Sequence, residues 1–284
     1  MSVQDSTGSA KEKVYLTPLI VSMIGTMNIS DYYEQEGSGD PIVFIHGSYA
    51  NTATWKAYFK ALSQDHHCIA IKLPGHCGLP DPEDMASPTI ETELSIIEAV
   101  VAELADKPIR LVAHSYGGVV ALSLALKGNV EIKNITLYEP VPMWVFDTVG
   151  DSANATLLAE FLAGYRAAVA NGEHFACGRV IDFWCDGDVF DGMPDFIKEG
   201  MLPLVENNLR HWDVGAILNY SMSELSEVTM PTQLVYGDCS NPAAAAICLH
   251  LADALPNTDV AVVNGANHFL VTSHASECIK LLTQ

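Results

Sequence analysis

A chain of 284 residues, 49% of them hydrophobic, can bury about three quarters of its unfolded surface, so it predicts one large domain that needs no disulfide or metal to hold it together. The 14 basic and 35 acidic residues give a formal net charge of −21, which excludes nucleic acid and anionic membranes as partners. The seven cysteines form no CxxC pair, and we expect reduced thiols and no metal site.

The N-terminal region shows no pattern of a cleavable leader. Residues 1–13 are polar and predict a flexible tail, and we expect a cytoplasmic protein. Residues 14–36 alternate loosely between apolar and polar side chains, which predicts one or two edge strands. The apolar stretch from Leu16 to Met27 is interrupted by Pro18 and is too short to span a bilayer.

Strand and helix patterns then alternate along the chain. Short apolar runs, typical of strands covered on both faces, stand at residues 42–45, 68–71, 109–113 and 135–138. Helical patterns lie between them, at residues 52–62, 89–104 and 116–126. The acidic loop 81–84 is expected to be solvated. This alternation predicts right-handed βαβ units and a parallel sheet.

Residues 142–228 break this rhythm. They are mostly helical in pattern, rich in Trp, Phe and Asp, and contain no clear buried strand, so we interpret them as a helical cap inserted over the sheet. Alternation resumes with strands at 233–236 and 260–263 and helices at 243–254 and 275–282. The α/β core is therefore expected to comprise residues 14–141 and 229–284.

The segment Ala113-His114-Ser115-Tyr116-Gly117-Gly118 lies between a predicted buried strand and an apolar helix. This is the context that the G-x-S-x-G nucleophile elbow requires. The strand must reverse sharply into the helix, so the residues two before and two after the serine must be small. Gly117 meets this condition, and Ala113, which replaces the usual first glycine, is small enough. Ser115 is the predicted nucleophile, exposed at a helix N-terminus.

Two further segments supply the groups that a serine nucleophile needs. His268, in Asn264-Gly265-Ala266-Asn267-His268-Phe269, follows the last predicted strand and is the predicted base. His46-Gly47-Ser48 follows the first buried strand. The backbone N–H groups of Ser48 and Tyr116 are predicted to form an oxyanion hole, and His46 is expected to orient this loop.

The strand-HG, A-H-S-Y-G-G and G-A-N-H-F motifs, in this order and spacing, resemble the α/β-hydrolase superfamily from about residue 32 to the C-terminus. The resemblance implies the α/β-hydrolase fold, with a mostly parallel central sheet flanked by helices and an inserted helical cap, and no cofactor. Members include esterases, lipases, lactonases, C–C bond hydrolases, epoxide hydrolases and dehalogenases. Relatives of the last two kinds use an Asp nucleophile, whereas this elbow holds Ser115.

The acid that orients His268 has two candidates. In many relatives it is an Asp three residues after the glycine that ends the next-to-last long strand, but here that position holds Ser240. Asp238, one residue after the glycine, is the alternative acid. Other relatives carry the acid after the strand that follows the elbow helix, where Glu139 stands in Leu137-Tyr138-Glu139-Pro140. We predict Glu139.

These residues predict a carboxylic ester hydrolase that acts on short to medium acyl esters through an acyl-enzyme. A C–C bond hydrolase, a lactonase and a perhydrolase use the same triad and remain alternatives. A catalytically silent protein that binds a small ligand on this fold is the rival from another class. A homodimer is left open.

His211 and Trp212 could line the pocket, but packing between helices explains them equally well. The residues expected to contact substrate are His46, Gly47, Tyr49, His114 and Trp144.

Overall fold

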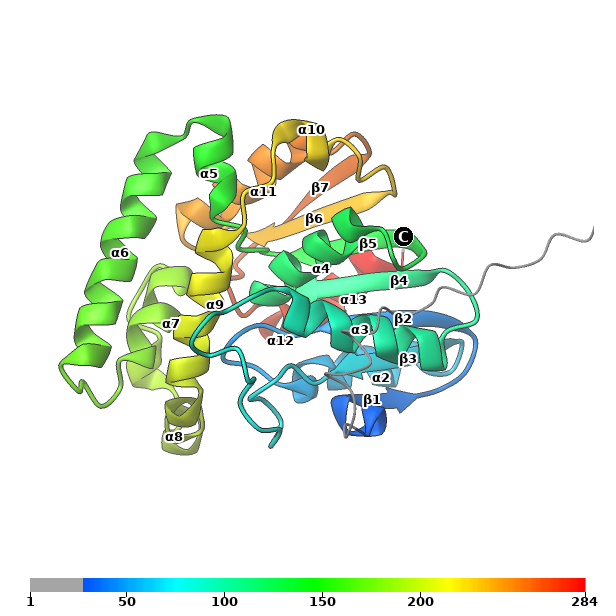
Figure 1. Cartoon of the computed structure of the whole chain (residues 1–284), viewed down its shortest axis with the longest axis horizontal. Coiled ribbons are helices and arrows are strands. Elements are labelled where there is room, and N and C mark those ends of the chain that lie inside the picture. The colour runs from blue at the N-terminus through cyan, green and yellow to red at the C-terminus, as the bar shows by residue number, and fades with distance from the viewer. Residues whose placement is uncertain (1–27, 284) are drawn as a thin grey trace, which may run out of the picture.

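The computed structural model describes residues 28–283 (Figure 1). The predicted tail, residues 1–13, and residues 14–27 of the predicted edge strands lie outside this part of the chain. The centre of the fold is a seven-stranded sheet in the order β1-β3-β2-β4-β5-β6-β7. The edge strand β1 runs antiparallel to β3, and all other neighbouring strands are parallel. The strands are β1 (Tyr33–Glu36), β2 (Asp40–Ile45), β3 (His66–Ile71), β4 (Ile109–His114), β5 (Ile132–Tyr138), β6 (Thr232–Gly237) and β7 (Thr258–Val263).

Helices cover both faces of the sheet because the inner strands are apolar on both sides. In β2, Val43 and Ile45 pack into the core that contains α3 and α4, whereas Ile42 and Phe44 pack with α2 and α13 on the other face. This is the pattern expected of buried parallel strands. The helices are α2 (Lys56–Leu62), α3 (Glu91–Leu104), α4 (Tyr116–Lys127), α11 (Pro242–Ala254), α12 (Leu270–Ser273) and α13 (Ala275–Leu282).

The segment between β5 and β6 is entirely helical among its regular elements. Figure 1 shows its longer helices gathered at one side of the sheet, with α6 outermost. The helix α9 contacts loops that follow two parallel strands: His211 bonds Ser48 after β2, and Asn207 bonds Pro74 after β3. The segment therefore lies over the carboxyl ends of the strands. Its helices are α5 (Trp144–Val149), α6 (Ser152–Ala170), α7 (Cys177–Cys185), α8 (Asp195–Met201), α9 (Val205–Ile217) and α10 (Met222–Leu225).

The predicted α/β fold is confirmed, with strand ends shifted by a few residues. One local expectation is wrong: the acidic loop 81–84 is not fully solvated. The carboxylate of Asp84 accepts hydrogen bonds from the Arg210 guanidinium, the Thr89 N–H and the Thr92 hydroxyl, and its side chain is only 12% exposed. Within the described residues, no helix has the length and apolar character needed to cross a bilayer.

Candidate active site

Ser115 occupies a strained turn between the last residue of β4 and the first residue of α4. Its backbone has φ 55° and ψ −124°, a region that non-glycine residues rarely adopt. The turn is tight because α4 passes close to the end of β2. A Cβ on Gly117 would lie 2.5 Å from the Ile45 carbonyl oxygen, so only glycine fits there. This packing presents the Ser115 hydroxyl to the space above the sheet.

Three predicted site residues form one hydrogen-bonded chain. The Nε2 atom of His268 lies 3.0 Å from the Ser115 Oγ, and its Nδ1 atom lies 2.6 Å from the Glu139 Oε2. The Trp184 ring stacks against the imidazole at a centroid distance of 5.5 Å and restricts its rotation. A neutral His268 that donates its Nδ1–H to Glu139 leaves Nε2 free to accept the serine proton.

Glu139 is completely buried and is held by the loop after β6. Its Oε1 accepts hydrogen bonds from the Gly237 N–H at 2.7 Å and from the Ser240 hydroxyl at 2.5 Å. Ser240 stands where the superfamily resemblance led us to look for an Asp, and its hydroxyl bonds the Glu139 carboxylate. Sequence reasoning associated the Ser240 segment with the choice of Glu139 but predicted no contact between the two side chains.

Asp238, the alternative acid, points elsewhere. Its side chain is exposed and accepts a hydrogen bond from the Gly265 N–H at 2.6 Å. The contact braces the loop that carries His268, but the carboxylate does not bond the imidazole. In this structure Glu139 is the carboxylate that bonds His268.

The loop after β2 lies against the nucleophile. A Cβ on Gly47 would approach the Ser115 Cβ to 2.9 Å, so glycine permits this approach. The Nδ1–H of His46 donates to the Gly47 carbonyl at 2.8 Å, and its Nε2 accepts the Leu73 N–H at 3.4 Å. The Gly47 carbonyl and the Ser48 N–H belong to one peptide group, so His46 fixes the direction of a predicted oxyanion donor.

The second predicted donor is the N–H of Tyr116, the first residue of α4. An N–H in the first turn of a helix has no partner within the helix, and the helix dipole adds positive potential there. Burial lowers the pKa of His46 to about 3, because the charged imidazolium would lie in the core. His46 therefore stays neutral at physiological pH and keeps its one-donor, one-acceptor arrangement.

Ser115 and His268 line a cavity of about 390 Å³, within the size range of small-ligand pockets. Among the described residues that line it, none is Asp, Glu, Lys or Arg. Its polar groups come from the core loops and from α9, including Ser48, Asn208 and His211. The apolar wall includes Val119, Val141, Met143, Val180, Trp184 and Trp212.

The five predicted substrate contacts divide into two groups. Gly47, Tyr49 and His114 line the cavity. His114 donates its Nε2–H to the His268 carbonyl at 2.8 Å and so also supports the base. The other two expectations need correction.

His46 is fully buried and does not line the cavity, because its ring hydrogen-bonds backbone groups below the loop. Trp144 is also absent from the lining, because its indole is buried and packs edge-on against Tyr220. Conversely, His211 and Trp212, which sequence reasoning left undecided, both line the cavity. Among residues 28–283, no three His, Cys, Asp or Glu side chains converge in a way suited to a metal ion.

Comparison with known proteins identifies the family. A profile described as the alpha/beta hydrolase family matches residues 42–281, most of the chain. The chain belongs to the alpha/beta hydrolase family. This α/β hydrolase shares the fold of MenH from S. aureus, with a TM-score of 0.70, 19% sequence identity, and coverage of 89% of this chain and 96% of that one.

Two curated relatives show similarity at the sequence level. The cis-3-alkyl-4-alkyloxetan-2-one decarboxylase of Shewanella oneidensis is 32% identical over 115 residues, which are 37% of this chain but only 34% of that protein. The monoacylglycerol lipase abhd6-B of Xenopus laevis is 22% identical over 264 residues, 87% of this chain and 75% of the lipase. The chain thus spans about a third of the first relative, and the relatives differ in the reactions that their names state.

Proposed function

We propose that this α/β hydrolase cleaves neutral carboxylic esters of short to medium acyl length through an acyl-enzyme. The observation that carries the proposal is the continuous hydrogen-bonded chain Ser115–His268–Glu139, which opens into an uncharged cavity. The monoacylglycerol lipase among its relatives is an ester hydrolase by name and aligns with most of the chain.

In this mechanism the Ser115 Oγ attacks the ester carbonyl while Nε2 of His268 takes its proton. Glu139 holds the ring and stabilises the imidazolium that forms. The backbone N–H groups of Ser48 and Tyr116 bind the oxyanion, and each such donor is worth about 3–4 kcal/mol in the transition state. The imidazolium then protonates the leaving alcohol. Water hydrolyses the acyl-enzyme by the same roles in reverse.

The uncharged lining favours neutral esters over the dienoate substrates of C–C bond hydrolases. A buried carboxylate without a cationic partner costs several kcal/mol, and the cavity lining offers no Lys or Arg to pair with it. The formal net charge of −21 also disfavours the approach of an anion. A neutral ester avoids both the cost of burying an unpaired carboxylate and the repulsion by the net negative charge.

Hydrolysis of p-nitrophenyl esters from acetate to dodecanoate tests the proposal. We expect the wild type to turn over the short and medium esters, and Ser115→Ala to lose about 10⁵–10⁶-fold in kcat, as serine hydrolases do when the nucleophile is removed. Folding of the variant is checked by circular dichroism. A folded wild type that hydrolyses none of the esters would contradict the proposal.

The same protein then serves to separate the alternatives. Product analysis with a lactone and a dienoate identifies a lactonase or a C–C bond hydrolase. Labelling by an active-site phosphonate distinguishes an enzyme from a silent binding protein, since only an activated Ser115 reacts. If Ser115 is not labelled, the binding role replaces the catalytic one.

A further inference from the structure

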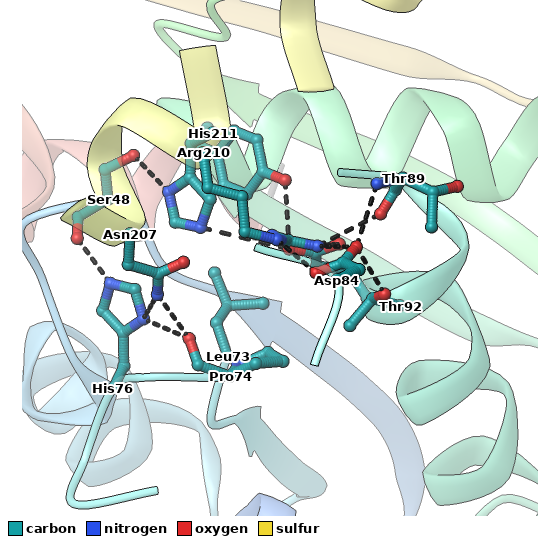
Figure 2. A network of polar contacts seen from close by, with 12 residues as sticks. Ser48, Leu73, Pro74, His76, Asp84, Thr89, Thr92, Asn207, Arg210 and His211 are labelled. Atoms are coloured by element: carbon teal, nitrogen blue, oxygen red, sulfur yellow. Dashed lines mark hydrogen bonds and ion pairs between the residues drawn. The ribbon is translucent and has the colours of Figure 1, made fainter. Parts of the chain in front are cut away.

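Ser48 is held on two sides by histidines that the proposed mechanism does not use (Figure 2). Its carbonyl oxygen lies 2.5 Å from Nε2 of His76, and its hydroxyl lies 2.7 Å from Nδ1 of His211. The two imidazoles stack almost in parallel at a centroid distance of 5.5 Å, and the Tyr116 ring stacks on His211 at 3.7 Å. The side chain of Ser48 is therefore fixed beside its own N–H, the predicted oxyanion donor.

The direction of the Ser48–His211 hydrogen bond follows from the surroundings of the second ring nitrogen. Nε2 of His211 is buried without a hydrogen-bond partner among the described residues, and the nearest charged oxygen is the Glu93 Oε1 at 4.0 Å. Burial lowers the pKa of His211 well below its ordinary value, so the ring is neutral and carries one N–H. That proton can be on Nε2 or on Nδ1.

The cluster behind His211 decides between the two positions. Arg210 is paired with Asp84 at 2.6 Å (Figure 2). It is also paired with Glu93 at 2.5 Å, so the three groups carry a net negative charge when both carboxyl groups are ionised. A lone pair of Nε2 that faced Glu93 would be repelled, whereas an N–H is attracted. We therefore assign the proton to Nε2, on the side of the Glu93 oxygen. Nδ1 is left as an acceptor, and the Ser48 hydroxyl donates to it.

A hydroxyl whose proton is engaged still has lone pairs to offer. Ser48 is partly exposed and lines the cavity, so these lone pairs are accessible to a bound ligand. An acceptor in a mainly apolar cavity favours ligands that bring a donor, because leaving either group unpaired costs free energy. The acceptor lies on the same residue as the N–H that would bind the ester carbonyl.

We propose that Ser48, held by His211, is a specificity site for esters whose acyl part carries a hydrogen-bond donor, a hydroxyl or an amide N–H, close to the scissile carbonyl. This inference rests on the proposed ester hydrolysis for its biological meaning. It concerns binding, however, and its test does not require turnover.

The test uses Ser115→Ala protein, which can hold an ester without cleaving it. Binding of methyl hexanoate is compared with binding of each enantiomer of methyl 2-hydroxyhexanoate and methyl 3-hydroxyhexanoate. Quenching of the fluorescence of Trp184 and Trp212, which line the cavity, reports occupancy. We expect at least one hydroxy ester to bind about tenfold more tightly than the unsubstituted ester, the effect of one hydrogen bond.

Ser48→Ala in the same background removes the acceptor but keeps the backbone N–H. We expect it to bring the ratio of the dissociation constants of methyl hexanoate and the preferred hydroxy ester close to one. His211→Phe keeps a stacked ring but removes the acceptor of the Ser48 hydroxyl. We expect it to reduce the difference in affinity between the hydroxy ester and methyl hexanoate. Equal binding of all the esters by the Ser115→Ala protein, or a preference that persists in Ser48→Ala, would overturn the inference. If the Ser115→Ala protein prefers the hydroxy ester but the wild type hydrolyses no ester, the proposed function is refuted. The inference about binding at Ser48 then still holds.

Discussion

The Glu139 carboxylate and the Ser240 hydroxyl, which are hydrogen-bonded to each other, follow adjacent strands of the sheet. The carboxylate follows β5, and the serine that bonds it follows the adjacent strand β6. The carboxyl ends of adjacent parallel strands meet at one edge, so either strand can present a group to His268. The three hydrogen bonds that Glu139 makes to His268, Gly237 and Ser240 fix both of its oxygens.

Glu139→Gln should lower kcat/KM for p-nitrophenyl butyrate by about 10³–10⁴-fold, because the amide cannot stabilise the imidazolium and favours the wrong tautomer. Asp238→Asn is the matched control: its amide oxygen can still accept the Gly265 N–H, and we expect kcat/KM to stay within a fewfold of wild type. Steady-state kinetics on both variants shows which of the two carboxylates acts through His268. A large loss in Asp238→Asn with little change in Glu139→Gln would assign the role to the other carboxylate.

At the scale of elements, α9 is tied to the core through a buried cation. Arg210 is 1% exposed and bonds Asp84 through two nitrogens, and it also reaches Glu93 on α3, which is fully buried. Taking three charges out of water is costly, and it is tolerated here because nearly every donor and acceptor is paired. The network fixes the helix that carries His211 over the cavity.

Arg210→Met should destabilise the protein by about 3–5 kcal/mol, because it leaves two carboxylates buried without a counter-ion. The control is Arg166→Met. Arg166 on α6 pairs with Asp213 at 2.5 Å, but both side chains are more than a third exposed, and such pairs contribute about 0–1 kcal/mol. Urea unfolding followed by circular dichroism measures both. Equal destabilisation by the two variants would mean that burial of the Arg210 network has no energetic role.

The sequence could predict the strands and the turn at Ser115, but not the contacts of Ser48 and Arg210. Apolar runs and turn residues located the strands, and the motif around Ser115 located the elbow, because both depend on neighbours in the chain. The partners of Ser48 and Arg210 could not be read in this way. Ser48 and His211 are 163 residues apart, and Arg210 and Asp84 are 126 apart. Their meeting depends on how the helices between β5 and β6 pack.

The same reason explains the misassigned tryptophan. An aromatic residue near the start of the inserted helices could face either substrate or core, and local sequence does not distinguish the two. Trp144 faces the core, whereas Trp184 and Trp212 reach the cavity.

At the scale of the whole molecule, four buried histidines link stability to pH. Burial lowers the pKa of His46, His76, His114 and His211 below the value near 6.5 that they regain on unfolding. Below pH 6.5 the unfolded chain therefore binds protons that the folded protein does not bind. Each such group lowers the free energy of unfolding by up to about 1.4 kcal/mol per pH unit between its folded and unfolded pKa values.

We therefore expect the urea midpoint to fall markedly from pH 7 to pH 5. Moderate salt in the buffer screens the repulsion within the acidic surface, which acidification would otherwise relieve. The number of protons taken up on unfolding at pH 5.5, from calorimetry in buffers of different ionisation enthalpy, gives an independent check. A midpoint that rises on acidification, with no proton uptake, would contradict this account.

The position of Glu139 in the chain has a consequence for variation of the helical segment. Ser115 and Glu139 follow consecutive strands, and both precede the long helical segment, so only His268 lies beyond it. Two of these three residues thus stand at the strand ends of one βαβ unit, β4-α4-β5, and the hydrogen bonds that hold Glu139 come from the core loop after β6 and from His268. No residue of the helical segment lies between Ser115 and Glu139 in the chain, so an insertion or deletion in the segment changes the sequence separation of His268 from this pair but not the separation within the pair.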